Sequence, residues 1–390
     1  MVGLPARGKS YIARKIVQYL SWCGSDARVF NVGSYRRSTL GAGQPAEFFD
    51  PGNAAGAEAR GRVAESALAD LLAWVKPGRT AVYDATNVGR KRRAWVRERC
   101  EAVGARVVYV ESVCNDPDVI EANIRQTKLR SPDYEGVAES KAIDDFRGRI
   151  AHYARAMEPV DERDGPYIRL TDVGRRIETY DLTGWTLGRL VFLVMNLHIA
   201  PRSIWLTRHG ESAWNAVGRI GGDAPLTPRG EAYAEALGSW LPTQVDAPDV
   251  WTSTLKRTVA TAARLPWPSR ALRVLDEIDA GRCDGLTYAQ IESRWPDEFA
   301  SRKADKLRYR YPLGESYEDV IARLDPVILE LERMRRPAVV VAHQAVLRGL
   351  IAYFTGRPAA DSPHLDVPLH TVIRLTPNAY GCDDTRFPLE

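Results

Sequence analysis

The segment Gly3–Ser10 (GLPARGKS) combines glycines, a lysine and a serine at a spacing that suits the binding of a polyphosphate. It matches the pattern G-x-x-x-x-G-K-[ST] and is followed by an amphipathic run typical of a helix. Backbone N–H groups in such a loop face phosphate oxygens, while Lys9 would reach the terminal phosphates and Ser10 would ligate Mg²⁺. We therefore expect a site for ATP with Mg²⁺, made by Gly3, Leu4, Pro5, Ala6, Arg7, Gly8, Lys9 and Ser10.

The carboxylate of Asp84 ends the second strand-like run after the phosphate loop, in the segment AVYDATN. Enzymes that transfer a phosphoryl group place an acid at such a point, near Mg²⁺ or the acceptor hydroxyl. An aspartate that ends a strand can also cap a helix, so this assignment depends on the phosphate loop. Basic residues occur in clusters at Arg36 and Arg37, at Arg60, in the run GRKRRAW at 89–95, and at Lys128. The run at 89–95 lies on an expected helix just after Asp84, where cations would anchor a phosphate on the acceptor. For part of these arginines a solvated helix face is the alternative.

In the second half, TRHGES places Arg208 and His209 directly after an apolar run. A histidine that accepts a phosphoryl group needs fixed cations for the equatorial oxygens and an acid for the leaving oxygen. Arg257, Glu277 and His343 each follow a strand-like run, where ligands bind in open α/β sheets. The pattern predicts phosphohistidine chemistry with no metal, and the remaining histidines (His152, His198, His364 and His370) are expected to be structural.

The elements that must position these residues alternate between strand-like and helix-like patterns, which predicts a mostly parallel sheet flanked by helices. In the first half the strand-like runs are 28–32, 79–84, 106–113 and 167–170, and the helix-like runs are 9–22, 57–75, 90–103, 116–129, 138–157 and 183–198. A phosphate loop normally follows a full strand, but only Met1 and Val2 precede Gly3. Either the first strand is short, which would weaken the anchoring of the loop, or the sequence starts too far downstream.

A second alternation begins near residue 203, after Pro201 interrupts the pattern. Its strand-like runs are 248–253, 272–275, 338–344 and 370–375, and its helix-like runs are 228–240, 256–264, 287–294, 316–335 and 344–354. We therefore expect two α/β domains, at 1–199 and 200–390.

Composition excludes several classes of protein. The net charge of +4 is too small for a nucleic-acid footprint, and no apolar run reaches the roughly 18 residues of a membrane span. The longest apolar stretch, 187–200, is broken by Arg189 and is expected to form a buried helix. Five scattered cysteines and no signal peptide favour a reducing compartment. We expect a cytoplasmic protein that binds neither nucleic acid nor membrane.

The segments RHGES, WTSTLKRT and AHQAVLR resemble the histidine phosphatase superfamily, whose α/β fold is phosphoglycerate mutase-like. Together with the phosphate loop, the segments FNVGSYRR, PRSIWLTRHGESAWN and KLRYRYPLGESYED resemble the bifunctional 6-phosphofructo-2-kinase/fructose-2,6-bisphosphatase family over essentially the whole chain. The resemblance implies a P-loop kinase domain that makes fructose 2,6-bisphosphate from ATP and fructose 6-phosphate. It also implies a phosphatase domain that returns this product to fructose 6-phosphate and phosphate, and a homodimer.

The resemblance also implies roles for residues that spacing alone does not assign. ATP would contact Asn123 and Lys128, and Lys128 would stabilise the transferring phosphoryl group beside Asp84 and Cys114, with Ser10 and Asp84 on the metal. Fructose 6-phosphate would contact Arg36, Arg37, Arg60, Thr86, Arg92, Arg163 and Tyr167. Fructose 2,6-bisphosphate would contact Asn215, Gly221, Tyr288, Arg302, Lys306, Tyr317, Gln344 and Arg348.

In the expected phosphatase mechanism, neutral His209 attacks the phosphoryl group while Glu277 protonates the departing oxygen, and Arg208, Arg257 and His343 offset the developing charge. Two alternatives remain open at this point. One is a phosphatase for another sugar phosphate, with a weak or inactive nucleotide-binding domain that regulates it. The other is a non-catalytic scaffold that senses metabolites.

Overall fold

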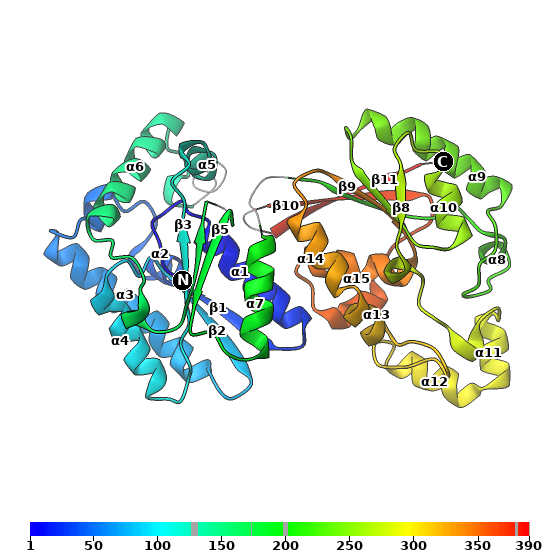
Figure 1. The fold of residues 1–390 in the computed structure, drawn as a ribbon, viewed down its shortest axis with the longest axis horizontal. Helices are drawn as coiled ribbons and strands as arrows, with labels where there is room; N and C mark the ends of the chain where they lie inside the picture. The colour runs from blue at the N-terminus through cyan, green and yellow to red at the C-terminus, as the bar shows by residue number, and fades with distance from the viewer. Residues whose placement is uncertain (126–131, 173, 198–201, 379–380, 390) are drawn as a thin grey trace. The chain divides into compact units, whose positions relative to one another are not determined.

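The structure, a computed structural model, describes residues 1–125, 132–172, 174–197, 202–378 and 381–389. Contacts divide the chain into two compact units, Met1–Ile199 and Ala200–Glu390 (Figure 1). Among the helices of these residues, none has both the length and the apolar character that crossing a bilayer requires.

The first unit alternates strands and helices. Its strands are β1 (Asp26–Asn31), β2 (Arg79–Asp84), β3 (Tyr109–Val113), β4 (Tyr167–Thr171) and β5 (Arg176–Tyr180). Its helices are α1 (Lys9–Trp22), α2 (Val32–Leu40), α3 (Ala54–Trp74), α4 (Arg90–Glu101), α5 (Pro117–Asn123), α6 (Glu139–Arg155) and α7 (Trp185–Asn196). The predicted strands and helices are present, whereas α2 and β5 escaped the sequence patterns. The end of the expected helix 116–129 lies outside the described residues.

The strand that leads into the phosphate loop is reduced to a bridge at Val2. The backbone nitrogen of Val2 donates to the Val110 carbonyl (2.8 Å), and that of Ser112 donates to the Val2 carbonyl (3.0 Å). On its other side, the nitrogen of Gly3 donates to the Thr86 carbonyl (2.9 Å). This short segment thus connects the parallel pair β1–β2 to β3–β4–β5, in which only β5 runs antiparallel.

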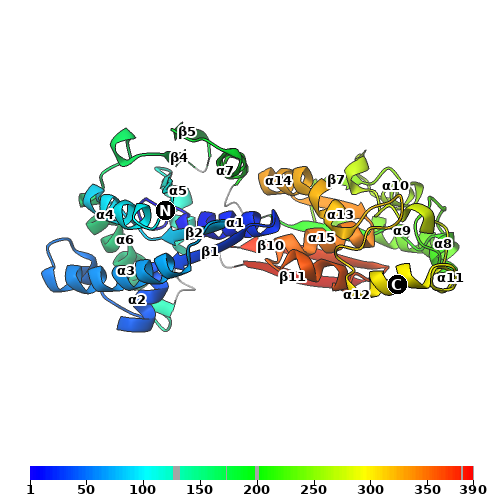
Figure 2. The ribbon, with the colours of Figure 1, turned by 90° about the horizontal axis from the view of Figure 1, so that it is seen from below.

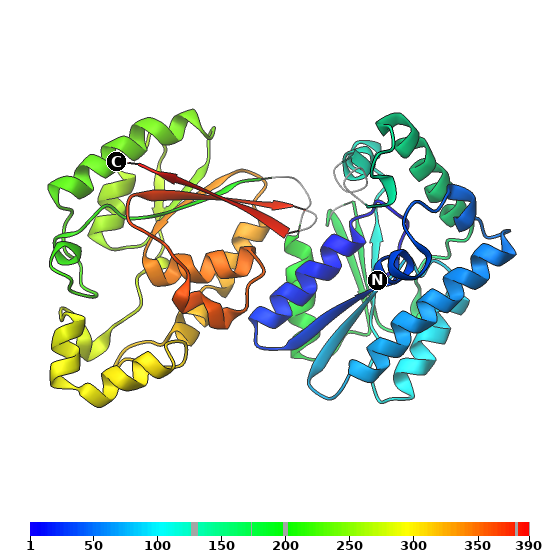
Figure 3. The same cartoon turned by 180° about the vertical axis from the view of Figure 1, so that it is seen from behind.

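Helices cover the sheet of the first unit. α3 and α4 pack their apolar side chains against Phe30 and Tyr83 of the neighbouring strands. α1 contacts β1, β2 and α7 (Figures 2 and 3). The buried helix expected in 187–200 is present as α7 up to Asn196, but only one side of it is buried, because Leu193 is buried whereas Phe192 and Met195 are each 53% exposed. A helix that covers only one face of a sheet needs only one apolar stripe.

The second unit has a six-stranded sheet in the order β11-β10-β6-β9-β7-β8. The strands are β6 (Ile204–Arg208), β7 (Asp249–Thr252), β8 (Ser269–Ala271), β9 (Ala338–Ala342), β10 (Thr371–Asn378) and β11 (Gly381–Pro388). The helices are α8 (Ala213–Ala216), α9 (Pro228–Trp240), α10 (Lys256–Ala262), α11 (Tyr288–Arg294), α12 (Pro296–Ala304), α13 (Tyr317–Arg323), α14 (Asp325–Arg333) and α15 (Gln344–Phe354). β6, β9, β7 and β8 are parallel, and β10 pairs antiparallel with β6 and β11.

Alternate residues of these strands face two layers of helices. Trp205, Val339 and Val341 pack on α9 and α10, which lie on one side of the sheet, with α14 and α15 on the other (Figure 1). The predicted strand 272–275 was wrong, because the third parallel strand is β8 and Arg273–Leu275 forms a 3₁₀ turn. Leu275 is fully buried, so the apolar pattern there reflects packing of a turn rather than a strand.

A buried ion pair fixes the loops at one end of the first sheet. Arg93 and Asp164 are joined by two hydrogen bonds (2.9 and 3.0 Å), and the Arg93 side chain is 0% exposed. The same guanidinium donates to the carbonyls of Asn87, Val88 and Glu158 (3.2, 3.0 and 2.8 Å). Arg93 therefore holds the turn that follows Asp84.

Replacing Asp164 with alanine should lower the free energy of unfolding of the first unit by about 3–5 kcal/mol, because the Arg93 charge would stay buried without a counter-ion. Denaturant unfolding measures this loss. Asp26→Ala is the matched control, since it removes a pair with Arg79 in which the carboxylate is 57% exposed, and it should cost less than about 1 kcal/mol. Equal losses in both variants would contradict the prediction.

Candidate active sites

The phosphate loop of the first unit makes left-handed turns just before α1. Gly3, Ala6 and Gly8 have positive φ (134°, 58° and 75°), and Gly8 is the residue that caps the helix. The first turn of a helix offers N–H groups that the helix's own ladder does not use, and such a turn suits an anion. Lys9 is buried and its Nζ donates to the Leu4 carbonyl (2.6 Å), so the amine lies against the loop. Ser10 is exposed in the first turn.

Neighbouring elements hold the loop from outside. The Ser112 hydroxyl at the end of β3 donates to the Arg7 carbonyl, and the Asn123 side chain donates to the Ala6 carbonyl (3.1 Å). A Cβ on Gly3 would lie only 2.4 Å from the Ser112 carbonyl oxygen. Glycine is therefore required there by both its φ and the close approach of β3.

Asp84 ends β2 next to the loop. Its carboxylate is 3% exposed and accepts a hydrogen bond from the Asn31 side chain, which also caps α2 by accepting from the Ser34 nitrogen (2.8 Å). β1 and β2 are paired so that Asn31 and Asp84 stand opposite each other. The acid is thus placed by strand register, and α2 begins from the same point.

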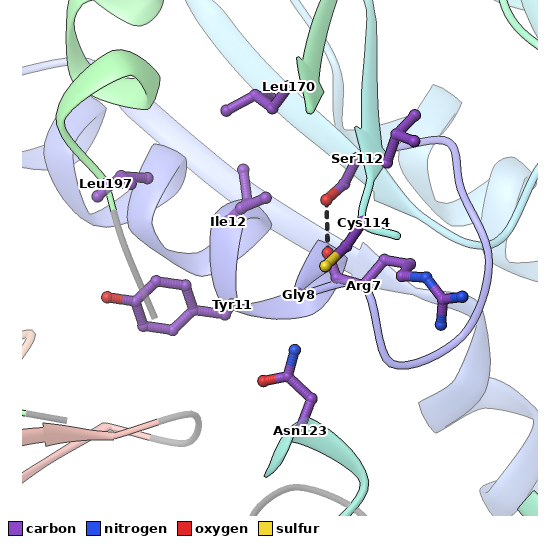
Figure 4. A pocket seen from close by; sticks show the side chains of 10 residues that line it. Arg7, Gly8, Tyr11, Ile12, Ser112, Cys114, Asn123, Leu170 and Leu197 are labelled. Atoms are coloured by element: carbon purple, nitrogen blue, oxygen red, sulfur yellow. Dashed lines mark hydrogen bonds between the residues drawn. The ribbon is translucent and has the colours of Figure 1, made fainter. Parts of the chain in front are cut away.

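A pocket adjoins the loop on the side of α1, as Figure 4 shows. Its lining residues are Arg7, Gly8, Tyr11, Ile12, Ser112, Val113, Cys114, Asn123, Leu170 and Leu197. Cys114 and Asn123 were expected near a nucleotide, and burial raises the pKa of the Cys114 thiol. The apolar walls from α1 and β4 carry no sequence motif, because ordinary core residues supply them.

Cations of the first unit gather around Asp133 and Phe49. Arg36 pairs with the Asp133 carboxylate (2.5 Å), from which Arg149 lies 3.9 Å away, and the Arg149 guanidinium stacks over the Phe49 ring at 4.4 Å. Among the described residues, Arg36 Nη1 is buried and has no hydrogen-bond partner. Sequence reasoning missed Arg149, which sits on a helix without any motif. Arg37 lies at the edge of this group, 3.8 Å from Asp133.

Tyr153 of α6 links this cluster to two further expected residues. The Tyr153 hydroxyl forms a hydrogen bond with the Thr86 side chain. Burial raises the pKa of Tyr153, and the positive charge of Arg60 offsets part of this rise. Arg60 also donates to the carbonyls of Phe48 and Asp50. Arg36, Arg60 and Thr86 are therefore brought together, with Tyr153 as a member that the sequence did not reveal.

The other expected contacts of the acceptor have partners of their own. Arg92 donates to the Tyr83 hydroxyl (3.3 Å) and stacks on Trp95. The Arg163 side chain is 77% exposed and pairs with Asp161 (2.6 Å). The buried Tyr167 donates to Glu178. Lys128 lies outside the described residues.

In the second unit, His209 follows β6 and is 3% exposed. Its Nδ1 donates to the Gly210 carbonyl (2.7 Å), because a carbonyl can only accept, so Nε2 carries the lone pair. Arg257 Nε donates to that nitrogen (3.1 Å), and the ring centroid of His343 lies 5.0 Å from that of His209. The two imidazoles and Arg257 therefore form one cluster.

Arg208 and Glu277 complete the expected set. Arg208 donates to the Val367 carbonyl (3.1 Å), while its Nε is buried and has no partner among the described residues. Glu277 accepts from the backbone nitrogens of Gln344 and Ala345 (3.1 Å each), at the start of α15. Since His343 is the residue before α15, one helix end places both groups.

Burial sets the charge of this cluster. Loss of hydration lowers the pKa of His209 well below 6.5, and the charges of Arg257 and Arg208 lower it further. The same loss, followed by His209 and the same arginines, lowers the pKa of His343. Both imidazoles are therefore neutral at neutral pH, whereas guanidinium groups stay charged.

A second group of cations and tyrosines adjoins it. Arg348 donates to the Tyr317 hydroxyl (3.0 Å). Burial raises the pKa of Tyr317, and the nearby charge of Glu277 adds to this rise. Arg302 donates to the hydroxyls of Tyr288 and Tyr311 (2.8 and 2.7 Å). Lys306 donates to the Pro363 carbonyl, and burial, reinforced by Arg348 and Arg302, lowers its pKa to about 8.

The last expected contacts are set by local turns. Asn215 closes a capping box with Ser212 at the start of α8. Gly221 has φ 75°, and a Cβ there would lie 1.5 Å from an oxygen of Asp284. Gln344 is the first residue of α15. His370, expected to be structural, accepts from the Glu211 nitrogen (3.2 Å) and stacks on Tyr233, so it supports the turn after His209.

Two family models match the chain. The model for 6-phosphofructo-2-kinase covers residues 1–201, and that for the histidine phosphatase superfamily (branch 1) covers residues 204–387. The chain therefore combines a kinase domain with a histidine phosphatase domain.

Relatives named 6-phosphofructo-2-kinase/fructose-2,6-bisphosphatase are similar along its whole length. The Gallus gallus relative is 47% identical over 98% of this chain and 83% of its own. The Homo sapiens relative, numbered 4, is 48% identical over 98% of this chain and 82% of its own. The Arabidopsis thaliana relative is 46% identical over 100% of this chain, which spans 53% of that relative. The chain belongs to the 6-phosphofructo-2-kinase/fructose-2,6-bisphosphatase family.

Gly3→Ala should impair the kinase half selectively, because the added Cβ would push the loop away from β3. Displacement of such a loop by about 1 Å can cost on the order of 100-fold in kcat/KM. Steady-state kinetics with ATP measure the loss. Gly61→Ala is the control, since its Cβ meets nothing within 4 Å on α3, and it should leave the kinetics unchanged. Normal kinase activity of Gly3→Ala would contradict the prediction.

Proposed function

We propose that the chain makes fructose 2,6-bisphosphate from ATP and fructose 6-phosphate in its first unit and hydrolyses it in its second. The observation that carries the proposal is the cluster of His209, Arg257 and His343 in one unit, on the same chain as the phosphate loop of the other. Family membership supports both activities. The proposed domains are 1–199 and 200–390, the proposed compartment is the cytoplasm, and a homodimer is the proposed assembly.

In the kinase half, the phosphates of ATP would lie on Gly3–Ser10 and its nucleoside part in the adjoining pocket. Mg²⁺ prefers oxygen ligands and takes one or two from the protein, with phosphate and water oxygens completing the set. The buried Asp84 carboxylate and the Ser10 hydroxyl fit that requirement. The metal would offset phosphate charge during transfer. Asn123 and Lys128 would contact the nucleotide, and Lys128 would stabilise the transferring group beside Asp84 and Cys114.

The phosphorylated sugar would occupy the cation cluster of the first unit. Arg36, with its unpartnered Nη1, and Arg60 supply donors near the Thr86 side chain. Arg37, Arg92, Arg163 and Tyr167 would complete the contacts. The C2 hydroxyl of fructose 6-phosphate is a hemiketal and more acidic than an ordinary alcohol, so positioning and cations carry the transfer.

In the phosphatase half, Nε2 of neutral His209 would form a bond to phosphorus as the bond from phosphorus to the C2 oxygen breaks. Glu277 would give its proton to that oxygen and later take one from the attacking water, which releases phosphate and frees His209. Arg208 and Arg257 would bind the equatorial oxygens. The sugar would contact the second cation group: Asn215, Gly221, Tyr288, Arg302, Lys306, Tyr317, Gln344 and Arg348.

The low pKa of His209 predicts how phosphatase kcat/KM depends on acid. Because burial holds the folded-state pKa well below 6.5, the nucleophile stays unprotonated as the pH falls through 6.5, and kcat/KM should not drop there. The acid limb should begin only at lower pH. A pH series of kcat/KM on fructose 2,6-bisphosphate, with stability checked at each pH, provides the measurement. A loss of kcat/KM on acidification with a midpoint near pH 6.5 would contradict it.

Two substitutions on one background test the division of labour. His209→Ala should lower bisphosphatase kcat at least about 10³-fold and leave kinase turnover within twofold. Lys9→Met should do the reverse, because it removes the cation at the terminal phosphates. Both rates are measured on each preparation as ADP release that depends on fructose 6-phosphate and as phosphate release. If the unaltered chain has no kinase activity, the result favours the alternative hypothesis, a sugar-phosphate phosphatase whose inactive nucleotide-binding domain regulates it.

A further inference from the structure

A chain of hydroxyl groups behind His343 determines which of its ring nitrogens carries the proton. His343 Nε2 lies 2.8 Å from the Ser253 hydroxyl, and that oxygen lies 2.7 Å from the Thr258 hydroxyl. The Thr258 oxygen lies 2.8 Å from the Leu255 carbonyl. His343, Ser253 and Thr258 are all 0% exposed, so water does not compete for these bonds.

The carbonyl at the end of this chain fixes the direction of every bond in it. A carbonyl oxygen only accepts, so the single proton of Thr258 points toward Leu255, and the other acceptor within reach, the Ser253 carbonyl at 3.3 Å, has the same property. Thr258 then has no proton for Ser253, and Ser253 must donate to Thr258. Ser253 has no second proton, so the contact with His343 needs a proton on Nε2.

The hydrogen-bond count agrees with this direction. The Ser253 oxygen accepts from the Leu255 nitrogen (3.1 Å) and from His343 Nε2, and it donates once, which uses its full capacity. The reverse direction would leave the Thr258 oxygen 2.8 Å from the Leu255 carbonyl with no proton between them. His343 Nδ1 therefore carries a lone pair, and among the described residues this buried atom has no hydrogen-bond partner.

We propose that Ser253 and Thr258 hold His343 in the Nε2–H form, so that its Nδ1 accepts a hydrogen bond from a P–OH group of the phosphoryl group that binds beside His209. The proposal rests on the proposed phosphatase function. A lone pair repels an unprotonated phosphoryl oxygen but accepts from a P–OH group. The phosphoryl group thus binds with one proton on an oxygen, and this P–OH donates to Nδ1. His343 stays neutral, and no proton is transferred.

The surroundings of His343 explain why the proton must come with the ligand. The groups that face it are His209, Arg257, Arg208 and Arg323, and Glu277 binds the backbone just after it. The four named first are neutral or positive and disfavour a proton on Nδ1 in the resting protein. A P–OH group brings its own proton and leaves Nδ1 unprotonated, so the hydrogen bond forms without that penalty. Ser253 and Thr258 are thus positioning residues that select the protonation state of the substrate.

Nitrogen-15 NMR of histidine in the full chain tests the resting state directly, with His343→Gln for assignment. The expected result is a protonated Nε2 and an unprotonated Nδ1 at neutral pH. Thr258→Val has nearly the same shape but removes the acceptor of Ser253, which should then donate to His343 and move the proton to Nδ1. Thr258→Ser restores the hydroxyl and should behave as the unaltered chain. A resting Nδ1–H form, or no change in Thr258→Val, would overturn the proposal.

Inorganic phosphate is the probe for the bound state. Adding it to the unaltered chain should place a hydrogen bond from a P–OH group on Nδ1 while Nε2 keeps its own proton. A phosphate complex in which Nδ1 makes no hydrogen bond would overturn the proposal. The NMR measurement on the resting chain does not depend on catalysis. A failure of the proposed phosphatase function would instead appear as absence of phosphate release, so the two failures can be told apart.

The pH profile gives a kinetic readout that a merely structural role would not produce. A phosphate monoester loses its second proton near roughly pH 6, so kcat/KM of the unaltered chain should fall about tenfold per pH unit above that point. The range 6 to 7.5 stays below the pKa of about 8 of Lys306. Thr258→Val should flatten this slope, and Thr258→Ser should keep it. Equal slopes in all three proteins would overturn the proposal.

Discussion

The site of the second unit depends on one constraint. The imidazoles of His209 and His343 are buried away from water among guanidinium groups. Arginine keeps its charge in any environment, whereas histidine gives up its proton when burial and neighbouring cations both oppose it. His209 and His343 are therefore neutral, and arginines, Arg208 and Arg257 among them, supply the fixed positive charge. This separation of roles leaves a nucleophilic lone pair inside a site that attracts anions.

Both units place their chemical groups at the same kind of position, the carboxyl end of parallel strands. Asp84 ends β2 and His209 follows β6, in sheets with separate cores. Side chains from neighbouring strands and from the start of the next helix meet at this edge, so a few short motifs suffice to build a site. The first unit adds a helix N-terminus for phosphates, and the second adds a buried histidine pair.

The motifs and the strands that carry them could be predicted from the sequence because their signals are local. Glycines before Lys9 fix the start of α1, and apolar runs before Asp84, His209 and His343 fix the strands. Tyr153, Arg149 and Ser253 could not be predicted, because each acts through partners distant in sequence. The 3₁₀ turn at Arg273–Leu275 was mistaken for a strand because burial, not periodicity, explains its apolar residues.

The first turn of α15 anchors two groups with different duties. His343 precedes this helix, and its first two N–H groups bind Glu277. Any tilt or slide of α15 would consequently move the Glu277 carboxylate and the His343 ring together. Under the proposed mechanism, a change that moves α15 would therefore alter proton transfer to the leaving oxygen and the binding of phosphate together.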